Sequence, residues 1–250
     1  MPETTDSVVL PPALEALWGR RSPGTRGPRA ELDVDRIVDA AVRIANDEGL
    51  EAVSMARVAH ELGFTTMSLY RHVQNKDELL QLMWNASART LGDWTPEGRT
   101  WRERLTSWAL RQREVVEENI WITRLPMSMP PLAPSSLAWV ELGLAALDEV
   151  DAPDYVKIRV LGLISQHGLI DARMVHDERQ AREAAEETGV ETDYATLIRE
   201  LADPATYPHL TRLVHSEPPA EAPADDPHAE YLFDIGIILD GFEAATRSGT

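Results

Sequence analysis

The chain has 250 residues and a formal net charge of -18, and it contains no cysteine, which excludes disulfides, thiolate metal sites and a cysteine nucleophile. So acidic a chain disfavours nucleic acid as a partner unless its charge is unevenly distributed. Residues 1–90 hold 10 Lys and Arg against 13 Asp and Glu, whereas residues 91–250 hold 14 against 29, so the N-terminal part can still present a local basic surface.

The first predicted elements are an arm and two helices. Residues 1–30 are rich in Pro, Gly and Arg and lack hydrophobic periodicity, which predicts a flexible arm. From Asp33, which can act as an N-cap, apolar residues follow the helical period until Gly49, and this pattern predicts an amphipathic helix. Ser54 can cap a second, shorter helix that ends at Gly63, where glycine permits a sharp turn.

The third predicted helix has an unusual distribution of side chains. It begins near Thr65, and only Leu69 and Val73, four residues apart, are positioned to anchor it on the other helices. Its remaining side chains face outwards. Asn75 followed by Glu78 resembles a capping box, which predicts that a fourth helix starts there.

The rest of the chain shows only helical patterns. Helices are predicted up to Ile120, over PSSLAWVELGLAALDEV to Val150, from Pro153 to about Glu187, over YATLIREL, and over the C-terminal segment AEYLFDIGIILDGFEAATR. Residues 204–228 are rich in proline and charge, which predicts a flexible loop. The sequence therefore predicts an all-α fold.

A short helix, a glycine turn and a second helix with an exposed polar surface are typical of the helix-turn-helix, whose second helix lies in the major groove of DNA. Small hydroxyls at a helix N-terminus suit base edges and phosphates, and an arginine can reach a guanine edge. A solvated helix surface explains any single Thr or Ser equally well, but exposed Met and Tyr side chains favour DNA. The predicted DNA-binding residues in this stretch are Thr65, Thr66, Met67, Ser68, Tyr70, Arg71, His72 and Lys76.

These motifs carry a resemblance to a known family. The segment IVDAAVRIANDEGLEAVSMARVAHELGFTTMSLYRHVQNKDELL is similar to the DNA-binding domain of the TetR family of transcriptional repressors, over about residues 33–86. The resemblance implies an N-terminal three-helix helix-turn-helix domain in residues 31–90 and a larger helical ligand-binding and dimerisation domain in residues 91–250. It further implies a bacterial homodimer that binds a palindromic DNA operator and is released by a small-molecule effector.

Further candidate DNA contacts lie in the second helix and in the arm. Where the family often has an arginine, this chain has Ala56, and the neighbouring Arg57 is the candidate replacement; Ser54 at the start of the same helix completes the predicted DNA-binding set. The arm offers a further possibility, because some helix-turn-helix proteins insert arginines into the minor groove. The four arginines concerned are Arg20, Arg21, Arg26 and Arg29; the alternative is a disordered tail.

A dimer is expected because one recognition helix reads too few base pairs, whereas a dimer places two of them in grooves about 34 Å apart. The resemblance locates the interface on the helix from Pro153 and on the last helix. The last helix also carries more apolar side chains than one face of a surface helix needs. The predicted interface residues are Leu232, Ile235, Ile238, Leu239 and Phe242; the alternative is that this helix is the core helix of a monomer.

A small-molecule pocket is predicted in the C-terminal part, which resembles the tetracycline repressor weakly through RTWRERL and YLFDIGIILDGFEA. The polar positions that hold tetracycline and its magnesium do not recur, so that ligand is not inferred. Aromatic and soft side chains predict an apolar or aromatic effector instead, although each is individually explained by ordinary core packing. The predicted ligand-binding residues are Trp108, Gln112, Trp121, Met127, Met129, Trp139 and His167.

No cofactor or metal is expected. His167 and Asp171 share a helix face, but His176 follows His167 by nine residues and is near half a turn out of phase. An enzyme is disfavoured because the sequence has no Ser/His/Asp order, glycine-rich phosphate loop or HExxH motif. A protein-interaction module that keeps the helix-turn-helix scaffold without specific DNA binding is the alternative function.

A cytoplasmic protein without membrane contacts is expected. The N-terminus lacks the basic start and apolar run of a signal peptide. In addition, no segment approaches the roughly 18 consecutive apolar residues that a membrane helix needs.

Overall fold

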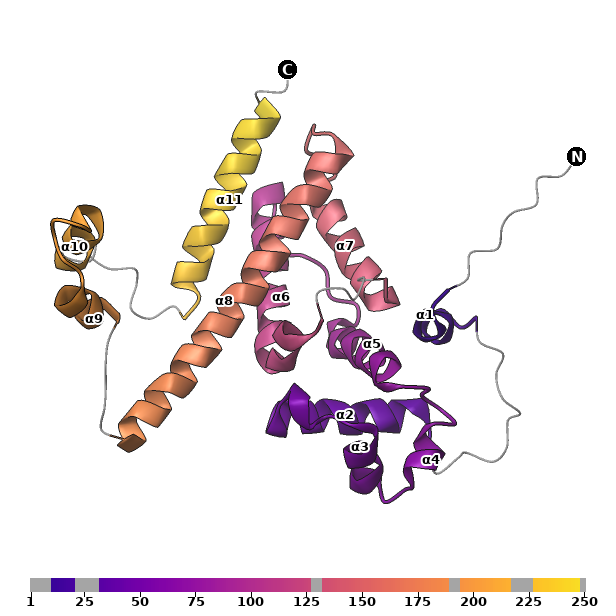
Figure 1. The fold of residues 1–250 in the computed structure, drawn as a ribbon. Helices are drawn as coiled ribbons and strands as arrows, with labels where there is room; N and C mark the ends of the chain where they lie inside the picture. The colour runs from indigo at the N-terminus through magenta and orange to yellow at the C-terminus, as the bar shows by residue number, and fades with distance from the viewer. Residues whose placement is uncertain (1–9, 21–31, 127–131, 189–193, 217–226, 248–250) are drawn as a thin grey trace, which may run out of the picture.

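The computed structural model describes residues 10–20, 32–126, 132–188, 194–216 and 227–247. All regular elements in these segments are helices, arranged as a small domain below a larger helical body (Figure 1). The α-helices are α1 (Pro12–Leu17), α2 (Val34–Glu48), α3 (Met55–Leu62), α4 (Thr66–Leu69), α5 (Lys76–Ser87), α6 (Trp101–Glu118), α7 (Pro134–Ala146), α8 (Asp154–Thr188), α9 (Tyr194–Leu201), α10 (Pro208–His215) and α11 (Ala229–Arg247). Short 3-10 helices are η1 (Leu50–Ala52), η2 (Ala88–Leu91) and η3 (Ile120–Arg124).

The small domain, α2 to α5, forms through local capping as the sequence predicts. The Asp33 carboxylate accepts a hydrogen bond from the Arg36 amide at 2.8 Å and caps α2. The Ser54 hydroxyl caps α3 in the same way. Gly63 then has a φ of +73°, a left-handed conformation that favours glycine and turns the chain from α3 into α4.

The start of α5 departs slightly from the predicted capping box. The Asn75 side chain accepts from the Glu78 amide at 2.8 Å, as expected for an N-cap. The Glu78 carboxylate, however, accepts from the Gln74 amide at 2.6 Å instead of from the Asn75 amide. The returning bond is therefore displaced by one residue, and it buries Glu78 with its charge satisfied.

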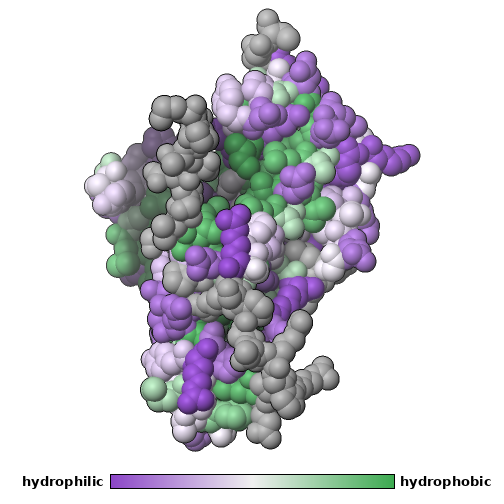
Figure 2. Space-filling view, turned by 90° about the vertical axis from the view of Figure 1, so that its right-hand side faces the viewer, coloured by the Kyte–Doolittle hydropathy of each residue, from purple (hydrophilic) through white to green (hydrophobic). Residues whose placement is uncertain are grey.

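The body consists of α6, α7, α8 and α11 around a second apolar core. Trp139 of α7 is stacked between Trp94 and Trp108, with ring centroids 5.7 Å and 5.0 Å away. The helices α7 and α8 approach closely at Gly143, where an added Cβ would lie 2.8 Å from the Leu161 side chain. On the α7 side, apolar side chains reach the surface between polar ones (Figure 2).

The apolar core of the small domain extends into the body. Trp121, Ile122 and Leu125, in and just after η3, are buried together with residues of α2 and α5. Arg89 of η2 adds an ion pair to Asp35 of α2 at 2.6 Å. The small domain is therefore joined to the body by direct packing of η3 and by this ion pair.

Part of the predicted flexible arm is a helix. Ala13 and Leu14 of α1 are buried, and α1 packs against α5. The Trp18 indole then donates to the Leu132 carbonyl, 3.0 Å away, just before α7. The prediction of a flexible arm is therefore wrong for residues 12–17. This helix is too short to show a hydrophobic period in the sequence, but its apolar side chains are still buried.

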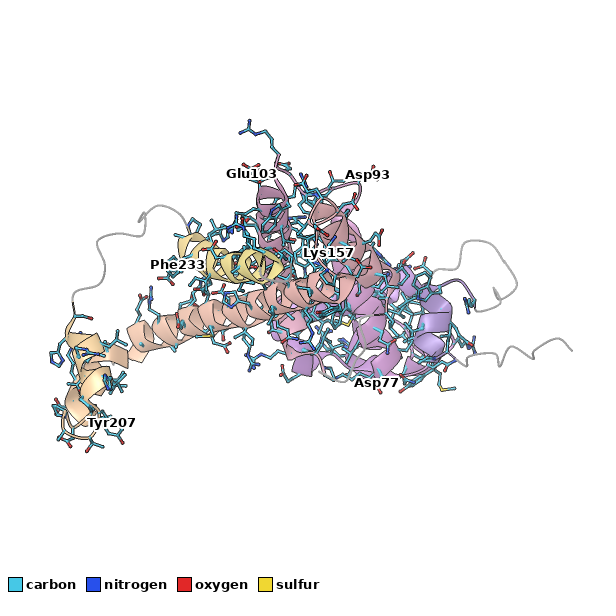
Figure 3. All side chains as sticks on the ribbon, turned by 90° about the horizontal axis from the view of Figure 1, so that it is seen from above. Asp77, Asp93, Glu103, Lys157, Tyr207 and Phe233 are labelled. Atoms are coloured by element: carbon cyan, nitrogen blue, oxygen red, sulfur yellow. The ribbon has the colours of Figure 1, made fainter. Side chains whose placement is uncertain are left out.

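A second difference concerns residues 204–228, predicted to be a loop. Within this range α10 forms, and Pro208 occupies its first turn, where proline does not interrupt a helix. Residues 217–226 lie outside the described residues. The helices α9 and α10 pack on each other and project from the end of α8 away from the body, with Tyr207 between them (Figure 3).

Candidate functional site

The recognition segment is α4 together with the turn that follows it. Leu69 and Val73 are fully buried and anchor the segment on α2 and α3, as predicted. The α-helix itself is shorter than predicted: it ends at Leu69, and the chain continues in hydrogen-bonded turns, with the Val73 amide donating to the Leu69 carbonyl at 2.9 Å. Two buried anchors hold the segment and leave its other side chains on the surface.

The side chains of this segment form the predicted outer surface. Met67 is 72% exposed and Tyr70 is 46% exposed, and Arg71 and Lys76 are exposed as well. Exposure of the apolar surface of Met and Tyr side chains to water is unfavourable, so burying that surface against a partner would be favourable. The DNA-contact role of this surface stays a prediction.

The hydroxyl groups at the start of α4 have a structural role that the sequence did not reveal. The Thr65 hydroxyl accepts from the Ser68 amide and lies 2.9 Å from the Ser68 hydroxyl. Thr65 is thus the N-cap of α4, and its hydroxyl is only partly available to a base or phosphate. Thr66 and His72 are half-buried, so they offer less surface than Met67.

Arg57 is held by two carboxylates of its own domain. Its guanidinium group donates to Glu48 at 2.6 Å and to Glu61 at 2.8 Å. These hydrogen bonds, first to Glu48 and then to Glu61, raise the pKa of Arg57 above its ordinary value. A guanidinium group that is already paired has little capacity for a phosphate, so the geometry favours a structural role.

This arrangement gives a testable expectation. We expect Arg57→Gln to leave operator affinity and its salt dependence nearly unchanged, because the guanidinium group is neutralised within the protein. Lys76→Gln is the matched change at an exposed cation without such carboxylates, and it should reduce the salt slope by about one per subunit. Binding isotherms at several salt concentrations measure both slopes. An equal decrease for Arg57→Gln would restore Arg57 as a DNA contact.

Only one of the four arm arginines lies in the described residues. Arg20 follows α1, and its amide donates to the Glu15 carbonyl at 2.8 Å. Arg21, Arg26 and Arg29 lie outside the described residues, so their predicted contact with the minor groove stays a prediction.

Three of the five residues predicted for the dimer interface lie in the core of the protomer. Ile235, Leu239 and Phe242 are buried against α6 and α8, which leaves them little surface for a partner. Leu232 and Ile238 are only half-buried. The exposed apolar side chains of α11 are Phe233 and Ile237, on the other side of the helix. The last helix thus serves both as a core helix and as an exposed apolar surface.

The predicted ligand residues occupy different environments. Trp108 is fully buried, and its indole donates to the Trp139 carbonyl at 3.0 Å, so these two residues tie α6 to α7. Trp121 is buried in the core shared with the small domain. Gln112 is half-buried on α6. Met127 and Met129 lie outside the described residues.

His167 lies against α11. It stacks on Tyr231 with centroids 5.5 Å apart, and its Nε2 lies 3.1 Å from the Asp234 carboxylate, so it faces α11. Asp171 binds Arg113 instead of approaching His167. No group of three His, Asp or Glu side chains among the described residues is arranged to hold a metal ion. The assignment of His167 to the ligand pocket is therefore not supported.

A buried charge cluster at the junction of α6, α8 and α11 was missed from the sequence. Arg113 is almost fully buried, and its guanidinium group donates to Asp171 at 2.7 Å and also to Glu117. The Arg113 Nη1 that donates to Glu117 also lies 2.8 Å from Nδ1 of His228, at the start of α11. Spacing within α6 indicates only the Glu117 pair, because the other partners are 58 and 115 residues away.

Tyr231 extends this cluster. Arg113 lies over its ring at 5.2 Å, and the phenol donates to the Ala109 carbonyl at 3.2 Å. Burial raises the pKa of Tyr231 well above its ordinary value, so the hydroxyl group stays protonated and keeps this bond. The start of α11 is thereby fixed to α6.

An open groove of about 770 Å³ runs along the outer side of α6. Its lining includes Trp94 and Leu110 but none of the predicted ligand residues. Both arginines in its lining are already paired, Arg111 with Glu114 and Arg102 with Glu243 of α11. The groove is therefore a solvated surface and not the predicted pocket.

Comparison with known proteins decides the family. The model for bacterial regulatory proteins of the tetR family matches residues 37–83, and the model for the tetracyclin repressor-like C-terminal domain matches residues 95–246. The HTH-type transcriptional repressor DrrR1 of Streptomyces coeruleorubidus is 30% identical over 99% of this chain and 91% of its own length. The chain belongs to the TetR family of transcriptional regulators.

Solved structures of TetR-family proteins share the fold. Apo ActR from Streptomyces coelicolor is 25% identical, with a TM-score of 0.70 over 89% of this chain and 100% of ActR. Two other structures hold ActR with (S)-DNPA, at 26% identity, and with actinorhodin, at 25% identity; their TM-scores are 0.68 and 0.66. They cover 86% and 87% of this chain and 99% of ActR in each case.

Family membership confirms several predictions made from the sequence. The TetR-family chain is an all-α transcriptional regulator with a DNA-binding helix-turn-helix, and it is not an enzyme, since its homologues are regulators. TetR-family regulators bind DNA operators and small-molecule effectors as dimers. Among the described residues, none of the helices has the length and apolar character needed to span a bilayer.

Proposed function

We propose that this TetR-family protein is a cytoplasmic repressor that binds a palindromic operator as a homodimer and is released by a small apolar or aromatic effector. The observation that supports it most is the exposed surface of the recognition segment, where Met67, Tyr70 and Arg71 surround the buried anchors Leu69 and Val73. A surface held this firmly by its two anchors is suited to a groove, because base readout requires fixed positions.

Charge distribution supports DNA as the partner despite the acidic composition. Arg71 and Lys76 are exposed beside the recognition segment, while the excess acid belongs to residues 91–250. At physiological salt the Debye length is about 8 Å, so surface carboxylates farther away than this repel DNA only weakly. A local cationic surface can therefore bind phosphate on an acidic protein.

A homodimer is supported by an unpartnered apolar stripe along α8 and α11. On α8 the stripe contains Tyr155, Leu163, Ile170 and Met174, and on α11 it contains Phe233 and Ile237. Burying six such side chains contributes on the order of 9 to 18 kcal/mol per protomer before association entropy is subtracted. Two copies that pack these stripes together form a four-helix bundle, as the family resemblance implies.

The hairpin of α9 and α10 extends the proposed interface. Leu201 is 77% exposed and Leu213 is 67% exposed, although both helices are strongly amphipathic. The hairpin projects beyond the α8 and α11 layer on the side away from the body (Figure 3). A second copy on that layer therefore lies within reach of the hairpin, and its surface would cover these leucines.

Disrupting the stripe should separate the protomers. We expect Phe233→Glu to convert the dimer to a monomer at micromolar concentration, because the bundle would bury two unpaired carboxylates near its axis. Leu137→Glu on the exposed side of α7 is the matched control and should leave the dimer intact. Sedimentation velocity measures the mass of each. A dimeric Phe233→Glu variant would contradict this interface.

Effector release requires coupling between the body and the recognition segment. The proposed route is α5, which follows that segment and packs against α7, together with η3, which contacts α2. A tilt of α5 changes the spacing of the two recognition segments in a dimer. Converting a 99:1 preference for the operator-bound form to 1:99 takes about 10⁴-fold preferential binding of the effector to the released form.

A gel shift tests the proposed function. The full chain should retard DNA from the region upstream of its own gene, and the affinity should fall steeply as salt increases. Unrelated DNA of the same length and composition is the control. Equal affinity for both DNAs would contradict a sequence-specific repressor.

A further inference from the structure

A polar pair lies at the contact between the two helices that carry the apolar stripe. The helices α8 and α11 pack against each other (Figure 1), and His167 of α8 meets Asp234 of α11, with its Nε2 3.1 Å from a carboxylate oxygen. The His167 side chain is 28% exposed and that of Asp234 is 46% exposed. Both side chains therefore still reach the surface of an isolated protomer.

Helical spacing places this pair between the two halves of the stripe. On α8, Leu163 lies one turn before His167 and Ile170 lies three residues after it, and both are exposed. On α11, Ile237 lies three residues after Asp234 and is exposed as well. Residues three or four apart are neighbours on a helix surface. A second copy that packs on both halves of the stripe therefore also covers the pair.

The contact between the two side chains depends on charge. The Nε2 atom of His167 is buried and makes no hydrogen bond to any residue that the structure describes. A neutral imidazole therefore does little for the neighbouring carboxylate, whereas an imidazolium at this distance neutralises it. A carboxylate that is taken out of water without a counter-charge is strongly disfavoured. Covering the pair thus favours the protonated form of His167.

The charged groups that lie deeper at this junction are already compensated. Asp171, one turn after His167 on α8, accepts a hydrogen bond from Arg113 of α6. Arg113 lies over the Tyr231 ring, on which His167 also stacks, and it donates to Glu117 too. The Tyr231 hydroxyl group stays protonated, because burial raises its pKa, and so it adds no charge.

Two further titratable groups lie near the start of α11. Glu230, one turn before Asp234, is exposed, and its negative charge also favours a proton on His167. His228 lies 2.8 Å from the guanidinium group of Arg113, which disfavours a second positive charge there. The group placed to take up a proton when the stripe is covered is therefore His167.

We propose that His167 and Asp234 make the homodimer sensitive to pH, so that two protomers associate more tightly at about pH 6 than at about pH 8, the range in which imidazole titrates. The sign follows from reciprocity: association favours the protonated form of His167, so protons favour association. The proposal rests on the homodimer of the proposed function and adds a means of regulating it. Operator binding needs two recognition segments, so tighter association also favours the operator-bound form.

Sedimentation velocity of the full chain at several protein concentrations measures the dissociation constant of the dimer. At constant ionic strength, we expect a constant at least about tenfold lower at pH 6 than at pH 8, since each dimer holds two pairs. His167→Gln cannot take up the proton, so its constant should stay near the wild-type value at pH 8 under both conditions. His60→Gln, at an exposed position of α3, is the matched control and should keep the full response. A pH response that persists in His167→Gln would overturn the proposal.

A second variant removes the carboxylate instead of the imidazole. Asp234→Asn has nearly the same shape and leaves no charge to compensate, so it should dimerise several-fold more tightly than the wild type at pH 8 and lose the pH response. Asp240→Asn is the matched control on the same helix. Its carboxylate lies 2.7 Å from Arg102 and is 76% exposed, so the variant should respond to pH like the wild type. Weaker association of Asp234→Asn at pH 8 would contradict the proposed role of the pair.

Failure of this proposal is distinguishable from failure of the proposed function. A dimer with the same dissociation constant at both pH values keeps the homodimer and refutes the pH response. A chain that is monomeric at both pH values refutes the homodimer, and the pH response with it. The gel shift at one fixed pH reports operator binding separately from either result.

Discussion

Replacing Arg71 with glutamate is expected to reduce affinity for the operator by about 100-fold or more. Arg71 is exposed beside the buried anchor Leu69, so its side chain is free to reach a guanine edge or a phosphate. Each such contact contributes about 1 to 3 kcal/mol, and a symmetric dimer loses two of them. The introduced carboxylates also repel phosphate, which adds to the loss.

Fluorescence anisotropy with labelled upstream DNA measures this effect. Arg99→Glu makes the same change of two charge units per subunit at an exposed position of the body, so it shows the general effect of that change without loss of the proposed contact. Comparing these two variants also distinguishes a DNA-binding regulator from a protein-interaction module, the two functions that the sequence left open. A protein-interaction module would show no specific DNA binding to lose, and Arg71→Glu would then behave like Arg99→Glu.

The small domain could be predicted almost completely because its signals are local. Asp33, Ser54 and Asn75 each cap a helix through a bond to a residue three positions later, and Gly63 makes its turn alone. Leu69 and Val73 likewise show their burial through spacing on one short segment. These features depend on neighbours within a few residues, which the sequence displays directly.

The partition of α11 could not be predicted in the same way. Apolar side chains occur around most of that helix, and only the positions of α6 and α8 decide which of them enter the protomer core. Ile235 and Phe233 are chemically similar and two residues apart, yet one is 1% exposed and the other 70%. The same limit applies to α1, whose burial depends on α5 far along the chain.

The interaction partners of polar side chains in the body could not be predicted from the sequence either. His167 and Asp171 share a helix face, but His167 lies 3.1 Å from Asp234 of α11 whereas Asp171 accepts a hydrogen bond from Arg113 of α6. Spacing within a helix identifies side chains that can meet each other, whereas these two meet other helices instead. The burial of Trp121 Nε1 and Ser136 Oγ, which have no hydrogen-bond partner in the part of the chain that the structure describes, likewise depends on how the surrounding helices pack.

Replacing Arg113 with methionine is expected to lower the free energy of unfolding by about 3 kcal/mol. The change keeps most of the apolar stem but leaves the carboxylate of Asp171, whose side chain is 19% exposed, without its counter-charge. Breaking a buried ion pair by removing one partner typically costs about 3 to 5 kcal/mol, because the remaining charge is poorly solvated. His228 loses its contact as well, which loosens the start of α11.

The double variant Arg113→Met with Asp171→Leu distinguishes charge from packing. It removes both members of the pair, so we expect it to recover most of the lost stability, whereas a packing defect would persist. Arg111→Met is the matched control on the same helix; its pair with Glu114 is more exposed, and its loss should cost less than about 1 kcal/mol. Urea unfolding at one fixed protein concentration measures all three, since the stability of a dimer depends on concentration. If the double variant is as unstable as Arg113→Met, the pair with Asp171 is not what stabilises this junction, and the other contacts of the Arg113 guanidinium group, with Glu117, His228 and the Tyr231 ring, are.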